Sequence, residues 1–444
     1  MKNSSASAAV WLAAAVGLWS SLCWGGEPVA VREAEIVSNA VAHSYVLRVA
    51  ASETEAARAA LQEARSGQGP SVDAALQASR YEGLVESALG PQIVIPAIET
   101  RYAGSVTVTQ PLFTGGRVRA AVAAAGLNLE AAEALRKAQD ANVVLDALAT
   151  YWAWSKAHCA VASFEAAVAR MEEHARTMRS QNDAGLVTEN DTLATEVALD
   201  RTRLQCKEAQ RRGDLARARL AFLTGRELPA EGTPELAAPA PSGELPDLPQ
   251  LVGEAMTGRL ERVAFRKTVE AADAAVRRAR AAFYPQAALI ARYEQARPNN
   301  LFFPPEDTWD DDAFAGVALQ WNLLDWGLSR SKTAEAAARR EQARLRAEQA
   351  DESIALQVRE ARISLQNAVD RSRLARKAEE SAQRNVKVAT DLWQNGLARH
   401  AEVLDAHARL TDAQSDSIAA AADAVLAQAA LKHATGQAIA PDPR

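Results

Sequence analysis

The chain has 444 residues, of which 48% are hydrophobic but only 5% aromatic, so small and aliphatic side chains favour closely packed helices over a thick globular core. The net charge of −6 is spread over interspersed acidic and basic residues, which argues against nucleic acid as a partner. The sequence lacks motifs for a serine nucleophile, a nucleotide-binding loop, a zinc protease or a dithiol pair. We therefore expect no enzyme activity and no catalytic residue, cofactor or metal.

The N-terminus has the order of a secretory signal peptide, which we assign to residues 1–25. Lys2 precedes a mostly apolar stretch from 8 to 22, which Cys23 and then two glycines follow closely. Lipid attachment at Cys23 stays open, although Leu22 stands where that signal uses a small residue. Beyond the signal, no segment approaches the roughly 18 uninterrupted apolar residues of a membrane-spanning helix. The mature chain is expected to be exported without a helical anchor.

The first half of the chain, residues 26–226, is expected to open with a helical stretch at 35–66, either continuous or divided into two helices near His43-Ser44. Two strands are expected to follow, at about 72–83 and 101–111. Apolar and hydroxyl residues alternate strictly through 105–109. Such alternation predicts a strand whose two faces differ in polarity.

A distinctive joint, Gln110-Pro111-Leu112-Phe113-Thr114-Gly115-Gly116-Arg117, follows the second strand. Pro111 is expected to end the strand, and Gly115 and Gly116 to turn the chain onto a new axis. No further proline interrupts the sequence from 117 to about 182. A helix of that length measures about 100 Å, which is too long to wrap a compact core.

The same joint occurs twice, which indicates a tandem duplication. An offset of 211 residues relates the joint at 110–117 to a copy at 321–327. The copy keeps Gly327 but places Trp326 where the first joint has Gly115, so we expect this turn to tolerate a side chain there. The offset persists over more than a hundred positions, as in the pairs Leu145/Leu356, Gly185/Gly396, Leu193/Leu404, Leu220/Leu431 and Gly225/Gly436.

The second half, residues 248–437, is expected to repeat the first, with strands at about 286–296 and 313–324. The proline-rich segment 227–247 is expected to be a linker that wraps the outside of the helices. Residues 438–444 form a C-terminal tail.

The predicted strands have the pattern of membrane strands. In the last one, Val317, Leu319 and Trp321 alternate with Ala318 and Gln320. One face is thus apolar and the other largely polar, over segments near the 9–11 residues that a tilted strand needs to cross a bilayer. The alternative is the edge of a soluble β-sandwich. Small barrels need about eight strands, so four strands per chain imply an oligomer.

Each half is expected to end in a long antiparallel coiled-coil hairpin, at 117–225 and 328–436. Gly185 and Gly396 end the first helix of each hairpin, at a tip that points away from the strands. Apolar residues recur at heptad spacing in both long helices, for example Val118, Val122, Ala125, Leu129 and Ala132, and Ile354, Val358, Ala361, Leu365 and Ala368.

Taken with the duplication, the sequence resembles the TolC-like outer-membrane efflux family over essentially all of the mature chain. The resemblance is carried by the joint at 110–117, its copy at 321–327, Phe283-Tyr284-Pro285, and the tips that follow Gly185 and Gly396. It implies a mainly α fold with a β-barrel portion. A long coiled-coil α-barrel would line the periplasm, and a twelve-stranded barrel in the outer membrane would combine four strands from each chain of a trimer.

The resemblance also implies a passive exit duct for a tripartite efflux or type I secretion system. The homotrimer would sit in outer-membrane lipid, dock a periplasmic adaptor at its tips, and receive cargo from a proton-driven or ATP-driven inner-membrane pump. An adaptor protein or a structural coiled-coil protein remain alternatives. The docking tips would comprise Gly185, Leu186, Val187, Thr188, Gly396 and Leu397, and the strand-to-helix joints Pro111, Gly115, Gly116 and Gly327.

Four residues match a gate at the periplasmic entrance of that family. Glu402 and Asp405 match a ring of acidic side chains, Trp393 matches a tyrosine, and Asp191 matches the acid of the first tip. An alanine stands where the family has an arginine, which leaves Arg399, one residue further on, as the candidate. The competing interpretation is an ordinary solvated helix face, on which charges recur every few residues.

The remaining histidines and cysteines suggest no site. His400 and His407 are seven residues apart and could share a helix face, but without a third ligand they make a poor metal site. We expect them to be solvated tip residues. Cys159 and Cys206 are expected to be unpaired small residues of the helical core.

Overall fold

The computed structural model describes residues 30–90, 93–229, 232–234, 246–299, 301 and 303–439. The expected signal peptide and residues 440–444 of the expected tail lie outside these residues. The chain divides into two compact units. The strand-bearing unit comprises Val46–Gln139 and Met256–Leu356, and the tip unit comprises the chain up to Tyr45, Asp140–Ala255, and the chain from Gln357 on.

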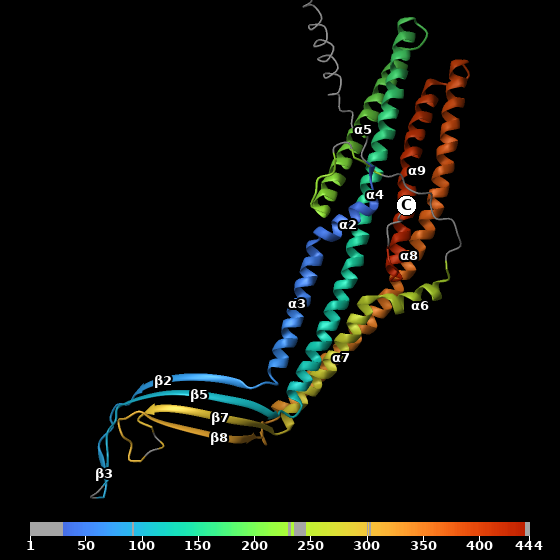
Figure 1. The fold of residues 1–444 in the computed structure, drawn as a ribbon. Coiled ribbons are helices and arrows are strands. Elements are labelled where there is room, and N and C mark those ends of the chain that lie inside the picture. Colours follow the sequence, from blue (N-terminus) through green and yellow to red (C-terminus); the bar gives the residue numbers. More distant parts are fainter. Residues whose placement is uncertain are drawn as a thin grey trace, which may run out of the picture. The chain divides into compact units, whose positions relative to one another are not determined.

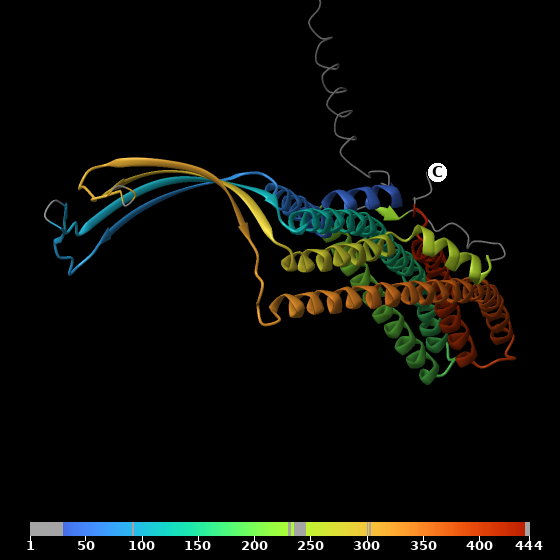
Figure 2. The same ribbon diagram turned by 90° about the horizontal axis from the view of Figure 1, so that it is seen from below.

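The strand-bearing unit contains an antiparallel sheet of four strands, which lie side by side as a curved ribbon (Figures 1 and 2). Its strand order is β2-β5-β7-β8. A short hairpin of β3 (Ser87–Leu89) and β4 (Ile93–Ile95) follows β2 in the chain. The four strands are β2 (Ser71–Arg80), β5 (Thr100–Phe113), β7 (Gln286–Arg297) and β8 (Asp310–Gln320).

The ends of three strands differ from the sequence-based expectation. β2 ends at Arg80, before the expected 83. β8 begins and ends earlier than the expected 313–324, because its partner β7 starts at Gln286, which pairs with Gln320. β5 also continues past Pro111 to Phe113. The pairing of β5 with β2 stops at Thr109, whereas the pairing with β7 passes Pro111 through a bulge. Proline has no N–H to donate to the ladder, and a bulge lets the strand continue past it because one residue is left unpaired there.

The register of the sheet collects apolar residues on one face. Residues paired directly across antiparallel strands share a face. One such row runs through Ala74, Val106, Tyr293 and Ala313. Taken along the strands, this apolar face comprises Val72, Ala74, Leu76, Val106, Val108, Leu289, Ala291, Tyr293, Ala315, Val317 and Leu319.

The opposite face of the sheet carries charges. The guanidinium of Arg101 donates a hydrogen bond of 2.9 Å to Glu294, and Arg292 pairs with the same carboxylate. Thr107 and Asp73 share this face. The sheet is therefore two-sided, as the alternation in its sequence predicted.

Long helices accompany the sheet in the strand-bearing unit. α3 (Tyr45–Ser66) and α7 (Leu260–Arg280) flank the first part of α4 (Arg117–Asp183), and α8 (Leu328–Gln394) begins in the same unit. Alanines allow α4 and α7 to approach closely, at Ala131, Ala134 and Ala264. None of the helices in the described part of the chain combines the length and the hydropathy of a membrane-spanning segment.

The tip unit is built on two helical hairpins. α4 and α5 (Glu189–Thr224) form the first, and α8 and α9 (His400–Ala434) form the second. α2 (Glu33–His43) packs against α5, and α6 (Leu248–Gly258) follows the linker.

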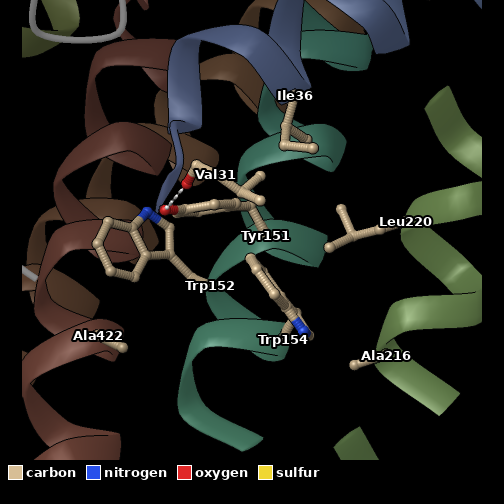
Figure 3. Packing of buried hydrophobic residues seen from close by; sticks show 8 residues of the cluster. All are labelled: Val31, Ile36, Tyr151, Trp152, Trp154, Ala216, Leu220 and Ala422. Carbon is tan, nitrogen blue, oxygen red and sulfur yellow. Dashed lines mark hydrogen bonds between the residues drawn. The ribbon is translucent and has the colours of Figure 1, made fainter. Parts of the chain in front are cut away.

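An aromatic core joins these elements of the tip unit (Figure 3). Tyr151 is fully buried, lies in edge-to-face contact with Trp152 and Trp154, and donates a 3.0 Å hydrogen bond to the Val31 carbonyl. Such contacts add to the burial energy of the rings. Leu220 of α5 and Ala422 of α9 complete the cluster, so both hairpins share one core.

Part of the expected linker is paired. β6 (Thr233–Pro234) lies parallel to β1 (Ala30–Val31), with Ala30 opposite Thr233. At the end of the linker, Arg362 of α8 donates a 3.2 Å hydrogen bond to the Pro246 carbonyl. These contacts give defined structure to short pieces of a segment whose proline-rich composition predicted an irregular linker.

Candidate functional site

The two strand-to-helix joints of the strand-bearing unit adopt the same backbone conformation. Gly115 and Gly116 have φ angles of 60° and 86°, and their counterparts Trp326 and Gly327 have 54° and 86°. This left-handed region favours glycine. Trp326 is the only non-glycine residue with positive φ among the residues the structure describes, so the duplicated turn keeps its shape against a steric penalty.

The joints differ in the space around the first turn residue. A Cβ on Gly115 would lie 2.8 Å from the Ala281 carbonyl oxygen and 2.8 Å from the Tyr284 Cβ. The expectation that this turn tolerates a side chain is therefore wrong for the first joint, because its neighbours close around it. Trp326 is 92% exposed. A Cβ at Gly116 or Gly327 would meet nothing within 4 Å.

The second joint contains a helix cap that the sequence analysis did not single out. Asp325 accepts hydrogen bonds from the backbone N–H of Gly327, at 3.0 Å, and of Ser329, at 2.8 Å. Hydrogen bonds from the hydroxyl and the backbone of Ser329 lower the pKa of the Asp325 carboxyl. In the first joint, Thr114 has the weaker equivalent, a 3.4 Å bond from Val118. An aspartate just before a helix is the sequence signal for such a cap.

The hairpin tips end their first helices in the same way. Gly185 and Gly396 both have φ 72°. In each tip the next residue closes the helix: the Leu186 N–H donates to the Gln181 carbonyl at 2.9 Å, and the Leu397 N–H to the Leu392 carbonyl at 2.8 Å. This is the Schellman arrangement. Leu186 and Leu397 are each 75% exposed, whereas Val187 is half-buried.

The two tips begin their second helices differently. Thr188 is the N-cap of α5, where its hydroxyl oxygen accepts from the Asp191 N–H at 3.2 Å and its hydroxyl donates to the Asp191 carboxylate at 2.7 Å. Asp191 therefore belongs to a helix cap of its own hairpin. Arg399 holds the N-cap position of α9 without a side-chain cap bond, and its guanidinium lies 3.7 Å from Glu402.

The acidic candidates of the second tip lie on the exposed side of α9. Glu402 and Asp405 are exposed, whereas Val403 and Ala406 are buried against Ala389 of α8. The helix thus separates an apolar stripe from an acidic one.

A cluster of aromatic rings joins the two tips, and it corrects the expectation that His400 and His407 are solvated. His400 is only 6% exposed. The ring of His174, from α4, stacks on His400 at 5.0 Å between centroids and lies 6.1 Å from His407. Trp393 lies 5.5 Å from His400 and 5.9 Å from His174. Sequence reasoning missed His174, because its contact with α9 exists only once the hairpins pack.

The hydrogen bonds of the cluster define one tautomer. The Thr195 hydroxyl donates to the Asp191 carbonyl at 2.8 Å and also lies 2.8 Å from His400 Nε2. Because a hydroxyl has one proton, its oxygen accepts here, and His400 carries a hydrogen on Nε2. His400 Nδ1 and His174 Nε2 are buried without a hydrogen-bond partner in the described structure.

These surroundings favour neutral rings. Burial, followed by the charges of His400 and His407, lowers the pKa of His174 to about 4. Burial also lowers the pKa of His400 and of His407; the Arg170 cation lowers the latter further, while Asp191 partly opposes the shift at His400. No cluster of metal-ligating side chains in the described residues is arranged to hold an ion.

The two cysteines of the tip unit are free thiols. Cys159 is half-buried and Cys206 is buried. Burial raises the pKa of both thiols, and the nearby Glu165 carboxylate adds to the effect at Cys206. Raised values make these thiols poor nucleophiles.

Comparison with known proteins agrees with this fold. The multidrug resistance outer membrane protein MdtQ of Escherichia coli O157:H7 is 24% identical over 272 residues, or 59% of this chain and 55% of that protein. The chain thus spans little more than half the length of the curated relatives it matches. The solved structure of VceC from Vibrio cholerae superimposes with a TM-score of 0.74 at 21% identity, over 92% of this chain and 97% of that one.

The CmeC outer membrane channel of Campylobacter jejuni superimposes with a TM-score of 0.78 at 16% identity, over 94% of this chain and 90% of that one. These likenesses confirm the expected fold class, mainly helical with a β-barrel portion. The model of the outer membrane efflux protein family matches residues 36–226 and 251–437, which follow the two halves of the duplication. The chain therefore belongs to the outer membrane efflux protein family.

Proposed function

We propose that this outer-membrane protein is the exit duct of a tripartite efflux or type I secretion system, a passive channel made of three copies of the chain. The observation that carries the proposal is the two-sided sheet with open edges. The tips and the entrance residues extend it.

The apolar face of the sheet needs a covering that the chain does not supply. Leu76, Val317 and Leu319 are 92%, 66% and 70% exposed. Burying a side chain of this kind is worth about 1.5–3 kcal/mol, so a face made of many of them is unfavourable in water. The hydrocarbon of the outer membrane covers it in our proposal, and the charged face with Arg101 and Glu294 lines a watery lumen.

The edges of the sheet require other copies of the chain. β2 and β8 are its outer strands, and neither has a further partner among the residues that the structure describes. Backbone groups left unpaired in hydrocarbon cost several kcal/mol each, so membrane strands occur in closed barrels. Four strands fall short of the roughly eight that close the smallest barrels. Three copies supply twelve.

The hairpin tips are proposed to dock the periplasmic adaptor. Leu186 and Leu397 present matching exposed side chains from equivalent turns. Small, rigid turns at Gly185 and Gly396 would let an adaptor approach their backbone closely. Val187 and Thr188 complete this tip surface.

The entrance is proposed to be narrowed by acidic side chains. Three-fold symmetry would bring three copies of Glu402 and of Asp405 into one mouth, where confined negative charge favours cations. Asp191, Trp393 and Arg399 are the proposed neighbours that shape this mouth. In the single chain, Arg399 lies beside Glu402 rather than beside Asp191.

The energy for transport would come from an inner-membrane pump, because we propose no catalysis in this chain. The name of the MdtQ relative refers to multidrug resistance, which favours drugs over proteins as the exported class. Two results test the proposed function together. The full chain should fractionate with the outer membrane, and the purified protein should conduct ions in planar bilayers. A chain recovered only from the periplasm, or one that never conducts, would contradict the proposal.

A further inference from the structure

The histidine cluster is an unusual way to join two helical hairpins. Three of the six histidines of the chain meet there. His174 comes from α4 in the first hairpin, and His400 and His407 come from α9 in the second. The contact at the tips therefore contains three groups whose unperturbed pKa lies near physiological pH, beside the apolar packing of Leu404 against Met171 and Leu199.

We propose that His174, His400 and His407 form an acid-sensitive contact, which holds the two tip hairpins together while its rings are neutral and releases them when the rings take up protons. The consequence for transport rests on the proposed function: in a channel whose entrance lies at these tips, release would widen the entrance in acid.

The geometry leaves no acceptor for a hydrogen on His400 Nδ1 or on His174 Nε2. His400 already donates from Nε2 to Thr195, so a proton must go to Nδ1, which is buried without a partner. His174 Nε2 is buried without a partner as well. A new N–H at either atom would be an unsatisfied buried donor within a cation, which is among the costlier groups to bury.

The charges around the cluster give little compensation. α4 contributes Arg170, whose cation acts on His407, and α5 contributes Asp191, whose carboxylate acts on His400. α8 contributes the neutral ring of Trp393. With all rings protonated, three new positive charges would repel one another across the hairpin contact, with Arg170 adding to the repulsion and Asp191 opposing it. Arg201, Asp405 and Asp412 are the other charged groups on this side, where they line the space beside His407.

Water can reach His407, the outermost ring of the cluster, through a cavity of about 250 Å³ that this ring lines. α4, α5 and α9 line it with Arg170, Arg201, Asp405 and Asp412 among others. A space of this size holds several water molecules. Water in this space can hydrate His407 as the hairpins begin to separate.

The direction of the pH effect follows from the packed and separated states. A separated imidazole has a pKa of about 6.5, and the packed His174 has a pKa of about 4. The depressed value means that the contact is fully favoured above about 6.5 and is lost as the pH falls toward 4. Protonation of His174 alone should raise the ratio of the separated to the packed state on the order of a hundred-fold at pH 4.5 relative to pH 7.5.

Contacts elsewhere should keep the hairpins attached at their other end. Lys156 of α4 lies 2.7 Å from Asp423 of α9, and Ala422 packs in the aromatic core of Tyr151. These contacts contain no histidine. Release is thus expected to separate the tips while the hairpins remain joined.

The test is a distance measurement between the tips of the full-length trimer in detergent. Spin labels are placed by Asp183→Cys and Asn395→Cys, both at exposed positions, in a chain without its native cysteines, and labelled chains are diluted with unlabelled ones. The pH 7.5 distance should give way to a longer one by pH 4.5, reversibly, with a midpoint between about 4 and 6.5, while helical circular dichroism is unchanged.

Variants separate this cluster from general effects of acid. His174→Phe with His407→Phe keeps flat rings that cannot be protonated, and should hold the pH 7.5 distance at pH 4.5. The matched control is His158→Phe, on the same helix but against Trp154, which should respond as the parent does. The proposal is overturned if the parent distance does not change, if its midpoint falls outside that range, or if the double variant responds like the parent.

The distance readout does not depend on conduction. Bilayer recordings of the same trimers report separately on the proposed function. A pH-dependent distance in trimers that never conduct would contradict the proposed channel function and still support the acid-sensitive contact.

Discussion

Gly115 offers a sharp prediction, because its neighbour in sequence serves as a control. Gly115→Ala places a Cβ at φ 60° and 2.8 Å from the backbone oxygen of Ala281. Gly116→Ala places one at φ 86° in open space. Both changes impose left-handed strain, and only the first also creates a clash.

The two costs can be compared per chain. Left-handed backbone costs a non-glycine residue about 1–2 kcal/mol, which is the whole expectation for Gly116→Ala. Forcing extra atoms into a filled site adds about 1–3 kcal/mol, because neither the Ala281 carbonyl nor the Tyr284 Cβ is the end of a flexible side chain. The difference of about 1–3 kcal/mol corresponds to roughly a fivefold to 150-fold change in a folding equilibrium.

The assay is the temperature at which trimers resistant to detergent disappear on gels, together with the yield of trimer in the outer membrane. Gly115→Ala should lose trimers at a clearly lower temperature than Gly116→Ala, and Gly116→Ala should lie between it and the parent. Equal effects of the two substitutions would refute the clash and leave only backbone strain at the joint.

The remaining predictions concern the joints, the entrance and the first tip. Gly116→Val and Gly327→Val should each lower trimer yield without changing ion selectivity, because a branched side chain worsens the left-handed strain; normal yield in both would show that the joint matters little. Glu402→Ala combined with Asp405→Ala should reduce cation selectivity in planar bilayers, and an unchanged reversal potential would exclude the acidic mouth. Thr188→Ala should remove about 0.5–2 kcal/mol of cap energy and speed hydrogen exchange in the first turn of α5, so unaltered exchange there would contradict the cap.

The sequence predicted backbone conformation best at glycine positions. Gly185 and Gly396 were expected to end helices, and both do so with the same φ. The duplication also carried through to Gly116 and Gly327, whose backbones match. Such positions can be recognised in a sequence because few residues other than glycine adopt a positive φ.

Contacts between residues far apart in the chain could not be predicted from the sequence. Nothing near Gly115 in sequence reveals that Ala281 and Tyr284 close around it. Likewise, His174 and His400 are far apart in the chain, and they meet only because two hairpins pack side by side. His400 was expected to be solvated because it lies at the start of a helix. The expectation was wrong because the other hairpin buries it.

Strand ends were a third kind of difference. The last strand was expected to begin at about 313, yet Asp310, Asp311 and Asp312 already pair with residues 294–296 of β7. A strand extends as far as its partner continues, whatever its own polarity.

The central claim is that open edges of one chain close against other copies in a ring of three. Cysteine at Gln77 of β2, combined one at a time with cysteines along β8 from Asp310 to Gln320, tests this directly under oxidation in the outer membrane. We predict that at least one register yields a covalent ladder of two and three chains that stops at three. A ladder that runs on beyond three chains, or no cross-link in any register, would contradict the account.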